Sequence, residues 1–311
     1  MSHSAILLVA IALLAHLLAD FVFQTDAIAE AKAAPGARAW RGLGMHAGIV
    51  AVCLLPFMLA YGARGLEYLV IVAVAHGLID RAKIVLNQRA VARAQPTPVG
   101  GPATAAGVAA PSVTQPGATP DAAPAADPGA DAPGDRAWTP LPAVLFLADQ
   151  AAHLAVLIGG AGALLFNQPT LTAWNSATNG VLGHLLPVAD PGAGLTVLVI
   201  LLDLVIINIR GGFFLVGTLL APRGFAAGSE PGPERVGASI GILERLIVCV
   251  LVLAGQAAAI GFVIAAKTLA RFRQLDDRHF AEYYLVGTLA SVTLALSTSI
   301  VAEAAISAAT R

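Results

Sequence analysis

Seven long apolar stretches constrain the fold of this chain more than any other feature of its sequence. A helix needs roughly 20 apolar residues to cross the hydrocarbon core of a membrane. Only 12% of the 311 residues are charged, about half the share found in soluble domains, so the chain cannot cover a globule with solvated side chains. We therefore predict an all-α, polytopic transmembrane helical bundle with about seven membrane segments. The expected segments are residues 5–23, 43–62, 66–86, 141–166, 194–220, 240–266 and 282–308.

Between residues 90 and 139 the composition changes abruptly to Ala, Pro, Gly and Thr, with almost no large apolar side chain. Such a segment buries too little apolar surface to offset the entropy lost on ordering. We predict a disordered linker over residues 90–139. It would separate an N-terminal three-helix membrane unit, residues 1–89, from a C-terminal membrane unit of about four helices, residues 140–311.

Charge and cysteine content narrow the range of partners. The net charge is −1, so no basic surface is expected for nucleic acid. Cys53 and Cys249 stand alone inside apolar runs, which argues against a disulfide framework and a cysteine-rich metal site. Membrane lipid is the partner that this composition predicts, and the sequence leaves protein partners and oligomeric state open.

Lysine and arginine residues in the loops predict orientation, because short basic loops stay on the cytoplasmic side. The loop before residue 43 and the segments flanking the linker are basic, whereas the loop between the second and third stretches holds only Arg64. We expect a multi-pass protein of the bacterial inner membrane, with the N-terminus outside and the linker in the cytoplasm. Basic residues at 267–278 also look cytoplasmic, although seven simple spans would place them outside. Either residues 172–188 dip into the membrane or residues 194–220 do not cross it fully.

Three apolar stretches each carry a His and an Asp spaced four residues apart, which places both side chains on one face of a helix. The first and third stretches should run toward the cytoplasm and read His then Asp. The fourth should run away from it and reads Asp then His. In space all three pairs would therefore point the same way, with Asp nearer the cytoplasm. The pairs are His16 with Asp20, His76 with Asp80, and Asp149 with His153.

Four antiparallel helices would bring these pairs into one polar layer, with His46 of the second stretch above them toward the cytoplasm. An ionisable side chain at mid-membrane costs about 2.5–3.5 kcal/mol on insertion scales and is a candidate for function. Imidazole and carboxylate together suit a divalent transition metal, namely zinc, iron or manganese. The candidate metal ligands are His16, His76, His153 and His46, and the candidate catalytic carboxylates are Asp20, Asp80 and Asp149.

Three functions fit such a layer, and the sequence leaves open whether the protein is an enzyme. The first is a metal-dependent hydrolase acting on a lipid or lipid-linked substrate, with one Asp as ligand or as general base. The second is an ion- or proton-coupled transporter, because titratable side chains in apolar helices also form proton relays. The third is a non-catalytic membrane scaffold in which the polar groups only join helices.

Six motifs, in order along the chain, resemble those of an uncharacterised bacterial family of integral membrane proteins, a domain of unknown function that opens with HxxxDxxxQ. They are HLLADFVFQTD, HGLIDRAK, DQAAHL, IGILERL, AIGFVIAAK and EYYLVGTLAS. The resemblance covers nearly the whole chain except the linker, which looks like an insertion. The family has no established activity, so the resemblance implies which residues matter and not what they do. Beyond the His and Asp residues above, it marks Gln24, Lys83, Gln150, Glu244, Arg245, Lys267 and Glu282.

Several of these additional residues also have simple structural interpretations. Lys83 is expected to extend toward the headgroups, and Gln24 to hydrogen-bond at a helix end. Glu244 opens the sixth stretch and Lys267 follows it, an arrangement that suits the helix dipole, while the basic residues that follow suit anionic headgroups. A more distant likeness in composition, without shared ordered motifs, is to membrane-bound metal-dependent hydrolases.

Overall fold

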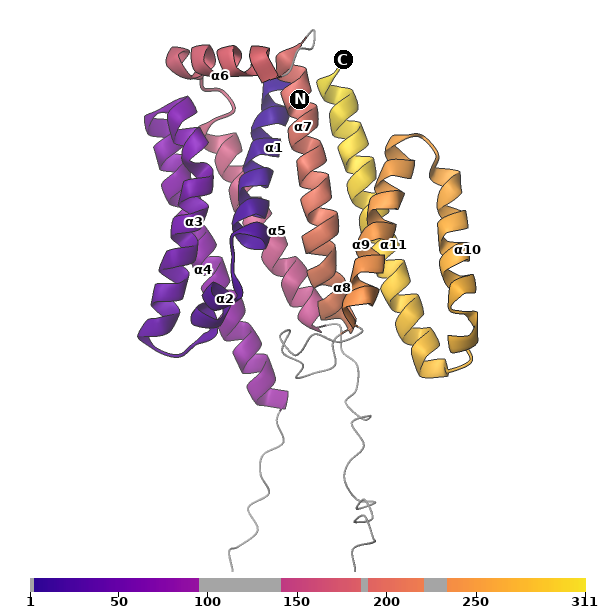
Figure 1. The fold of residues 1–311 in the computed structure, drawn as a ribbon. Coiled ribbons are helices and arrows are strands. Elements are labelled where there is room, and N and C mark those ends of the chain that lie inside the picture. The colour runs from indigo at the N-terminus through magenta and orange to yellow at the C-terminus, as the bar shows by residue number, and fades with distance from the viewer. Residues whose placement is uncertain (1–2, 95–140, 186–189, 221–233) are drawn as a thin grey trace, which may run out of the picture.

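The structure is a computed structural model that describes residues 3–94, 141–185, 190–220 and 234–311, and these residues are helical without any strand (Figure 1). Most of the predicted linker lies outside the described residues, and its first residues, 90–94, continue the preceding helix. The helices and helical turns are α1 His3–Leu17, η1 Leu18–Val22, α2 Asp26–Ala33, α3 Ala37–Tyr61, α4 Ala63–Ala94, α5 Leu141–Leu164, α6 Thr172–Leu185, α7 Pro191–Ile206, η2 Ile207–Gly211, α8 Gly212–Leu220, α9 Glu234–Leu253, η3 Ala257–Ala259, α10 Ile260–Ala270, η4 Phe272–Gln274 and α11 Arg278–Ala309.

Five helices in the described part of the chain are long and apolar enough to cross a membrane. They match five of the expected segments. The expected count of about seven is not confirmed, because the other two segments are covered by α4 and by the α9–α10 pair, which are not among the five. In α4 the physical reason is charge, because Glu67, Asp80, Arg81 and Lys83 interrupt its apolar run. The five are Ser4–Val22, Ala37–Tyr61, Leu141–Leu164, Pro191–Leu220 and Phe280–Ala309.

The distribution of side chains is inverted relative to a soluble protein. Large apolar side chains such as Val52, Leu78, Val250 and Val301 are exposed on the outer faces of the helices, while His and Asp side chains are buried between them. Contiguous apolar surface of this kind is stable against lipid and not against water. The apolar helices therefore indicate a membrane protein.

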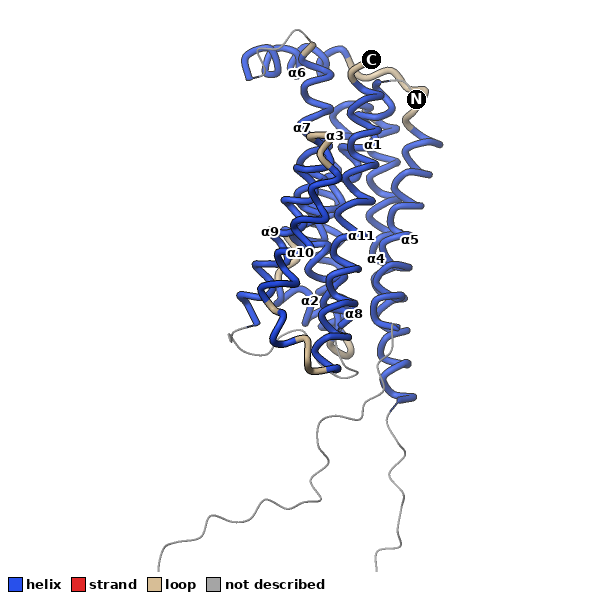
Figure 2. The backbone as a smooth tube through the Cα atoms, turned by 90° about the vertical axis from the view of Figure 1, so that its right-hand side faces the viewer, coloured by secondary structure: helices blue, strands red, loops and turns tan. Residues whose placement is uncertain are grey.

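The long helices run along a common axis, and α6 lies across one end of the bundle (Figures 1 and 2). Both chain termini lie at that end, whereas α2 lies at the opposite end. Helices α1 and α4 run toward the α2 end, and α3 and α5 run away from it. These directions place the Asp of each His/Asp pair nearer the α2 end, as the residue order predicts.

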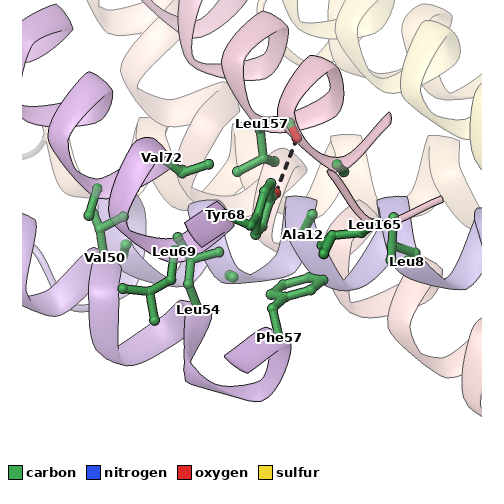
Figure 3. Close-up of a cluster of buried hydrophobic side chains, with 14 residues drawn as sticks. Leu8, Ala12, Val50, Leu54, Phe57, Tyr68, Leu69, Val72, Leu157 and Leu165 are labelled. Atoms are coloured by element: carbon green, nitrogen blue, oxygen red, sulfur yellow. Dashed lines mark hydrogen bonds between the residues drawn. The ribbon is translucent and has the colours of Figure 1, made fainter. Parts of the chain in front are cut away.

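Two apolar cores hold the bundle together, and α1 contributes to both. The first joins α1, α3, α4 and α5 (Figure 3), and within it the Tyr68 hydroxyl donates a hydrogen bond to the Leu157 carbonyl at 3.1 Å. Gly160 permits this contact, because a Cβ there would lie 3.3 Å from the Tyr68 ring. The second core joins α1 to α7, α9, α10 and α11. Helix α5 thus packs with α1, α3 and α4.

Residues 240–266 form a helical hairpin, which the sequence analysis did not anticipate. Helix α9 ends at Leu253, Gly255 adopts a positive φ of 70°, and α10 then runs back beside α9. The Lys267–Glu244 ion pair at 2.5 Å joins the two arms. Residues 267–278 therefore return to the end of the bundle at which α9 begins (Figure 1). The hairpin therefore accounts for the position of these basic residues without a membrane dip of residues 172–188 or an incomplete crossing of residues 194–220. Residues 191–220 are helical throughout.

Candidate functional site

Four imidazoles from four helices meet inside the first core. His16 on α1, His46 on α3 and His153 on α5 surround His76 on α4, with ring centroids 5.6, 4.9 and 4.1 Å from that of His76. The centroids of His16 and His153 lie 5.2 Å apart. All four residues are at most 3% exposed. The predicted convergence of the histidines is therefore present in the structure.

Two of these imidazoles and one carboxylate form a compact triangle of potential ligand atoms. His46 Nε2 lies 2.9 Å from His76 Nε2, and Asp20 Oδ1 lies 3.2 and 3.1 Å from these two nitrogens. Asp20 Oδ1 is nevertheless buried without a hydrogen-bond partner of acceptable geometry in the described part of the protein. Asp80 Oδ2 lies beside the triangle, 3.6 Å from His46 Nε2 and 3.9 Å from His76 Nε2.

The backbone around Asp20 is a π-helical turn, in which the Phe23 amide donates to the Leu18 carbonyl five residues earlier at 2.8 Å. Single π turns often occur at functional sites, because the extra residue re-aims side chains and frees a carbonyl. Here the Phe21 carbonyl accepts a hydrogen bond from Arg210 Nε at 2.9 Å. Arg210 belongs to the second π turn, η2, so the two irregular turns are directly linked.

Helix α5 contributes a second, adjoining group of ligand atoms. His153 Nδ1 lies 2.9 Å from the Asp149 carbonyl oxygen, which makes Nδ1 the protonated nitrogen. Its Nε2 then carries the lone pair and is buried without a partner among the described residues. Gln150 Oε1 lies 3.3 Å from His16 Nε2, and Gln150 Nε2 donates to Asp149 Oδ2 at 3.2 Å. Gln150 thus links His16 on α1 to Asp149 on α5.

Two lysines neutralise carboxylates of the cluster. Lys83 Nζ lies 2.7 Å from Asp149 Oδ2 on the neighbouring helix, so Lys83, which was expected to extend toward the headgroups, is also paired with a carboxylate of the cluster. Lys32 Nζ lies 2.7 Å from Asp80 Oδ2 and also donates to Gln24. In the sequence, Lys32 is one of the basic residues in the loop before residue 43, and no motif assigned it to the site.

Helix α2 places Lys32, and its local sequence explains how. Thr25 caps the helix, its hydroxyl accepting a hydrogen bond from the Ile28 amide at 3.4 Å, as Thr commonly does before a first turn. The helix then packs directly on α3 at Gly42, where a Cβ would lie 2.6 Å from the Lys32 amide nitrogen. The Thr-Asp start and Gly42 were the available signals for this element.

The site as a whole carries unbalanced charge. Three carboxylates, Asp20, Asp80 and Asp149, face two ammonium groups, Lys32 and Lys83, which leaves one negative charge when the imidazoles are neutral. Buried charge is costly unless it is paired or coordinates a metal. Sets of three side chains whose ligand atoms lie within 4.8 Å of one another can hold a metal ion. They are His16–Asp20–His76, His46–His76–Asp80 and Asp80–Asp149–His153.

The chain segment that carries the first part of this site matches a family model. Residues 7–96 match DUF3307, a family described as proteins of unknown function. The resemblance to an uncharacterised family is thereby confirmed for this part of the chain. No curated protein and no solved structure matches the chain. The DUF3307 region supplies the α1, α3 and α4 side of the cluster and also Lys32, while Asp149, Gln150 and His153 lie beyond it.

Four residues marked by the sequence resemblance lie beyond the DUF3307 region and away from the cluster. Glu244 and Lys267 pair across the α9–α10 hairpin. Glu282 forms an exposed ion pair with Arg278 on the same helix. Arg245 is buried, and it donates from Nε to the Asn208 carbonyl at 2.6 Å and from its terminal nitrogen to Ser291 at 3.1 Å. These contacts give Arg245 a role in holding the second π turn against α9 and α11.

Proposed function

We propose that this protein is a membrane-embedded, metal-dependent hydrolase whose ion is held by Asp20, His46 and His76. The observation that carries the proposal is the triangle of ligand atoms with edges of 2.9, 3.1 and 3.2 Å. Atoms about 2.0–2.1 Å from a tetrahedral zinc ion lie roughly 3.3 Å apart. A hydrogen-bonded pair would satisfy Asp20 Oδ1, which instead has no partner of acceptable geometry among the described residues.

Three protein ligands leave a fourth position open, which is the arrangement of catalytic and not of structural zinc sites. An ion in this position would polarise a substrate oxygen and activate a water molecule. His16 is placed to act as the base, because its Nδ1 lies 3.9 Å from Asp20 Oδ2 and its Nε2 can donate to Gln150. A base held in one tautomer by a third residue is a recurring catalytic arrangement.

Burial and location support a lipid or lipid-linked substrate. The site lies between helices whose outer faces are apolar, and its carboxylates lie nearer the α2 end of the bundle. Basic residues gather in the chain segments at that end, including Arg38, Arg41, Arg81 and Arg89. By the positive-inside rule this end faces the cytoplasm. The substrate would then approach from the inner leaflet of the cell membrane.

Metal analysis tests the proposal directly. Protein purified in mild detergent should carry zinc, iron or manganese, or take it up on titration, to at least one ion per chain. The His46→Ala, His76→Ala double variant should lose the ion, because two of its three ligands are gone. Glu282→Gln, which changes an exposed residue far from the cluster, should retain it. Wild-type protein that neither carries nor takes up metal would refute the proposal.

A coupled transporter is the second candidate, supported by one feature of the same site. Titratable groups of α4, α5 and the η1 turn touch in an unbroken chain, from Lys83 through Asp149 to His153, His76 and Asp20. Such chains conduct protons in pumps and carriers. Reconstitution into liposomes distinguishes the two, because a transporter would show proton or metal-ion flux that the His76→Ala variant lacks, and a hydrolase would show none.

A further inference from the structure

The ion proposed above leaves a second set of ligands unused. Asp80, Asp149 and His153 offer ligand atoms that lie within 4.8 Å of one another. The three residues are between 3% and 5% exposed and come from α4 and α5. A single tetrahedral ion has four ligands, whereas the cluster contains four imidazoles and three carboxylates.

Two acceptor atoms in this second set have no donor among the described residues. His153 Nδ1 donates a hydrogen bond to the Asp149 carbonyl, so the buried Nε2 carries a lone pair. Asp149 Oδ2 accepts from Lys83 and Gln150, but Asp149 Oδ1 is buried without a partner in the described residues. Leaving a buried acceptor unsatisfied costs about 1–3 kcal/mol, and more for a charged group. A cation is the partner that such acceptors require, and Asp149 Oδ1 can bind one while Oδ2 keeps its contact with Lys83.

The surroundings of this set resemble a metal site in one further respect. An imidazole that binds a metal almost always donates a hydrogen bond from its other ring N–H to a carbonyl or carboxylate, which fixes the ring and the tautomer. His153 makes this contact with the Asp149 backbone at 2.9 Å. The carboxylate of Asp149 is in turn held by Lys83 at 2.7 Å.

We propose that Asp80, Asp149 and His153 bind a second divalent transition-metal ion, so that the cluster is a two-ion centre in which Asp80 lies beside the first ion. The inference rests on the proposed function, because it requires the first ion at Asp20, His46 and His76. Asp80 Oδ2 lies 3.6 Å from His46 Nε2 of the first site, and the His76 and His153 rings are 4.1 Å apart. The two sets of ligands are therefore adjacent, as they must be in a two-metal centre, whose ions are about 3.5–4 Å apart.

Stoichiometry tests the inference separately from the proposed function. Purified full-length protein is stripped with a chelator and titrated with Mn²⁺, and bound metal is counted after desalting. We expect two ions per wild-type chain. One ion per wild-type chain would overturn the second site and leave the proposed hydrolase centre standing, whereas no bound ion would overturn both.

Variants locate each ion. His153→Gln and Asp149→Asn should each bind one ion, as should His46→Gln, while the His46→Gln, His153→Gln double variant should bind none. Retention of two ions by both His153→Gln and Asp149→Asn would overturn the assignment. Size-exclusion profiles matching wild type are required for every variant, and His153→Gln serves if Asp149→Asn, which loses its ion pair with Lys83, does not fold.

Electron paramagnetic resonance provides an independent readout. Two Mn²⁺ ions about 3.5–4 Å apart are exchange-coupled, so the fully loaded wild type should show a coupled signal in place of the six-line spectrum of isolated Mn²⁺. His153→Gln should restore the isolated spectrum. A six-line spectrum from wild type with two ions bound would place the ions too far apart to form one centre, and would overturn the inference.

Discussion

Replacing Lys32 by Met should strongly destabilise the metal-free protein, and the structure allows the loss to be estimated. Lys32 Nζ lies 2.7 Å from Asp80 Oδ2, and the two side chains are only 8% and 7% exposed. Removing one partner of a buried ion pair leaves the other charge uncompensated, which costs about 3–5 kcal/mol. Arg278→Met is the matched control, because its ion pair with Glu282 is exposed and such pairs contribute about 0–1 kcal/mol.

The two buried or half-buried free thiols, Cys53 and Cys249, provide the assay, because their labelling by a thiol reagent reports unfolding in mixed detergent–SDS micelles. The Lys32→Met, Asp80→Asn double variant completes a thermodynamic cycle. It should lose less free energy of unfolding than the sum of the two single variants, since neither charge is left alone. A loss below about 1 kcal/mol in Lys32→Met, or strict additivity in the cycle, would refute the buried pair.

Three further predictions follow from close packing and from ligand chemistry. Gly42→Ala should lower the free energy of unfolding by about 1–3 kcal/mol, because its Cβ would lie 2.6 Å from the backbone of α2. The control is Gly48→Ala on the same helix, whose Cβ meets nothing within 4 Å and which should be neutral. Equal effects of the two substitutions would contradict the α2–α3 contact. Gly212→Ala should have a similar cost, because its Cβ would lie 2.6 Å from Arg245 Nε, and Gly217→Ala, which meets nothing, is its control in the same thiol-labelling assay. Metal uptake should fall as the pH is lowered from about 8 to about 5, because imidazole and carboxylate bind ions only when deprotonated; equilibrium dialysis that shows constant uptake would exclude these ligands.

The local part of the candidate site was predictable from sequence. Spacing of four residues places His16 with Asp20 and Asp149 with His153 on single helix faces, and residue order combined with antiparallel helices predicts one common layer. The structure contains this layer. Apolar length predicted five of the membrane-spanning candidates for the same reason, since both signals depend only on residues close together in the chain.

Contacts that depend on irregular backbone were not predictable in the same way. Lys32 reaches Asp80, 48 residues away, only because a short capped helix folds back onto α3 at Gly42. The apolar run at 240–266 has the composition of one span, yet Gly255 reverses the chain within it. The π turn at Asp20 has no sequence signature that distinguishes it from an ordinary helix end. In each case a tertiary contact or a single glycine overrides a periodic pattern.

The pattern of satisfied and unsatisfied atoms argues against a cluster that serves helix packing alone. Polar groups that join membrane helices are stabilising when they hydrogen-bond to each other, and the second core shows this in Arg245, which donates to Asn208 and Ser291. In the first core the lysines and Gln150 satisfy the outer atoms, while four buried atoms have no partner among the described residues, namely Asp20 Oδ1, Asp149 Oδ1, His153 Nε2 and His46 Nδ1. The two carboxylate oxygens and His153 Nε2 are acceptors, and the surrounding charge is negative by one unit when the imidazoles are neutral. Three buried acceptors without a donor, around a net negative charge, are complementary to a cation.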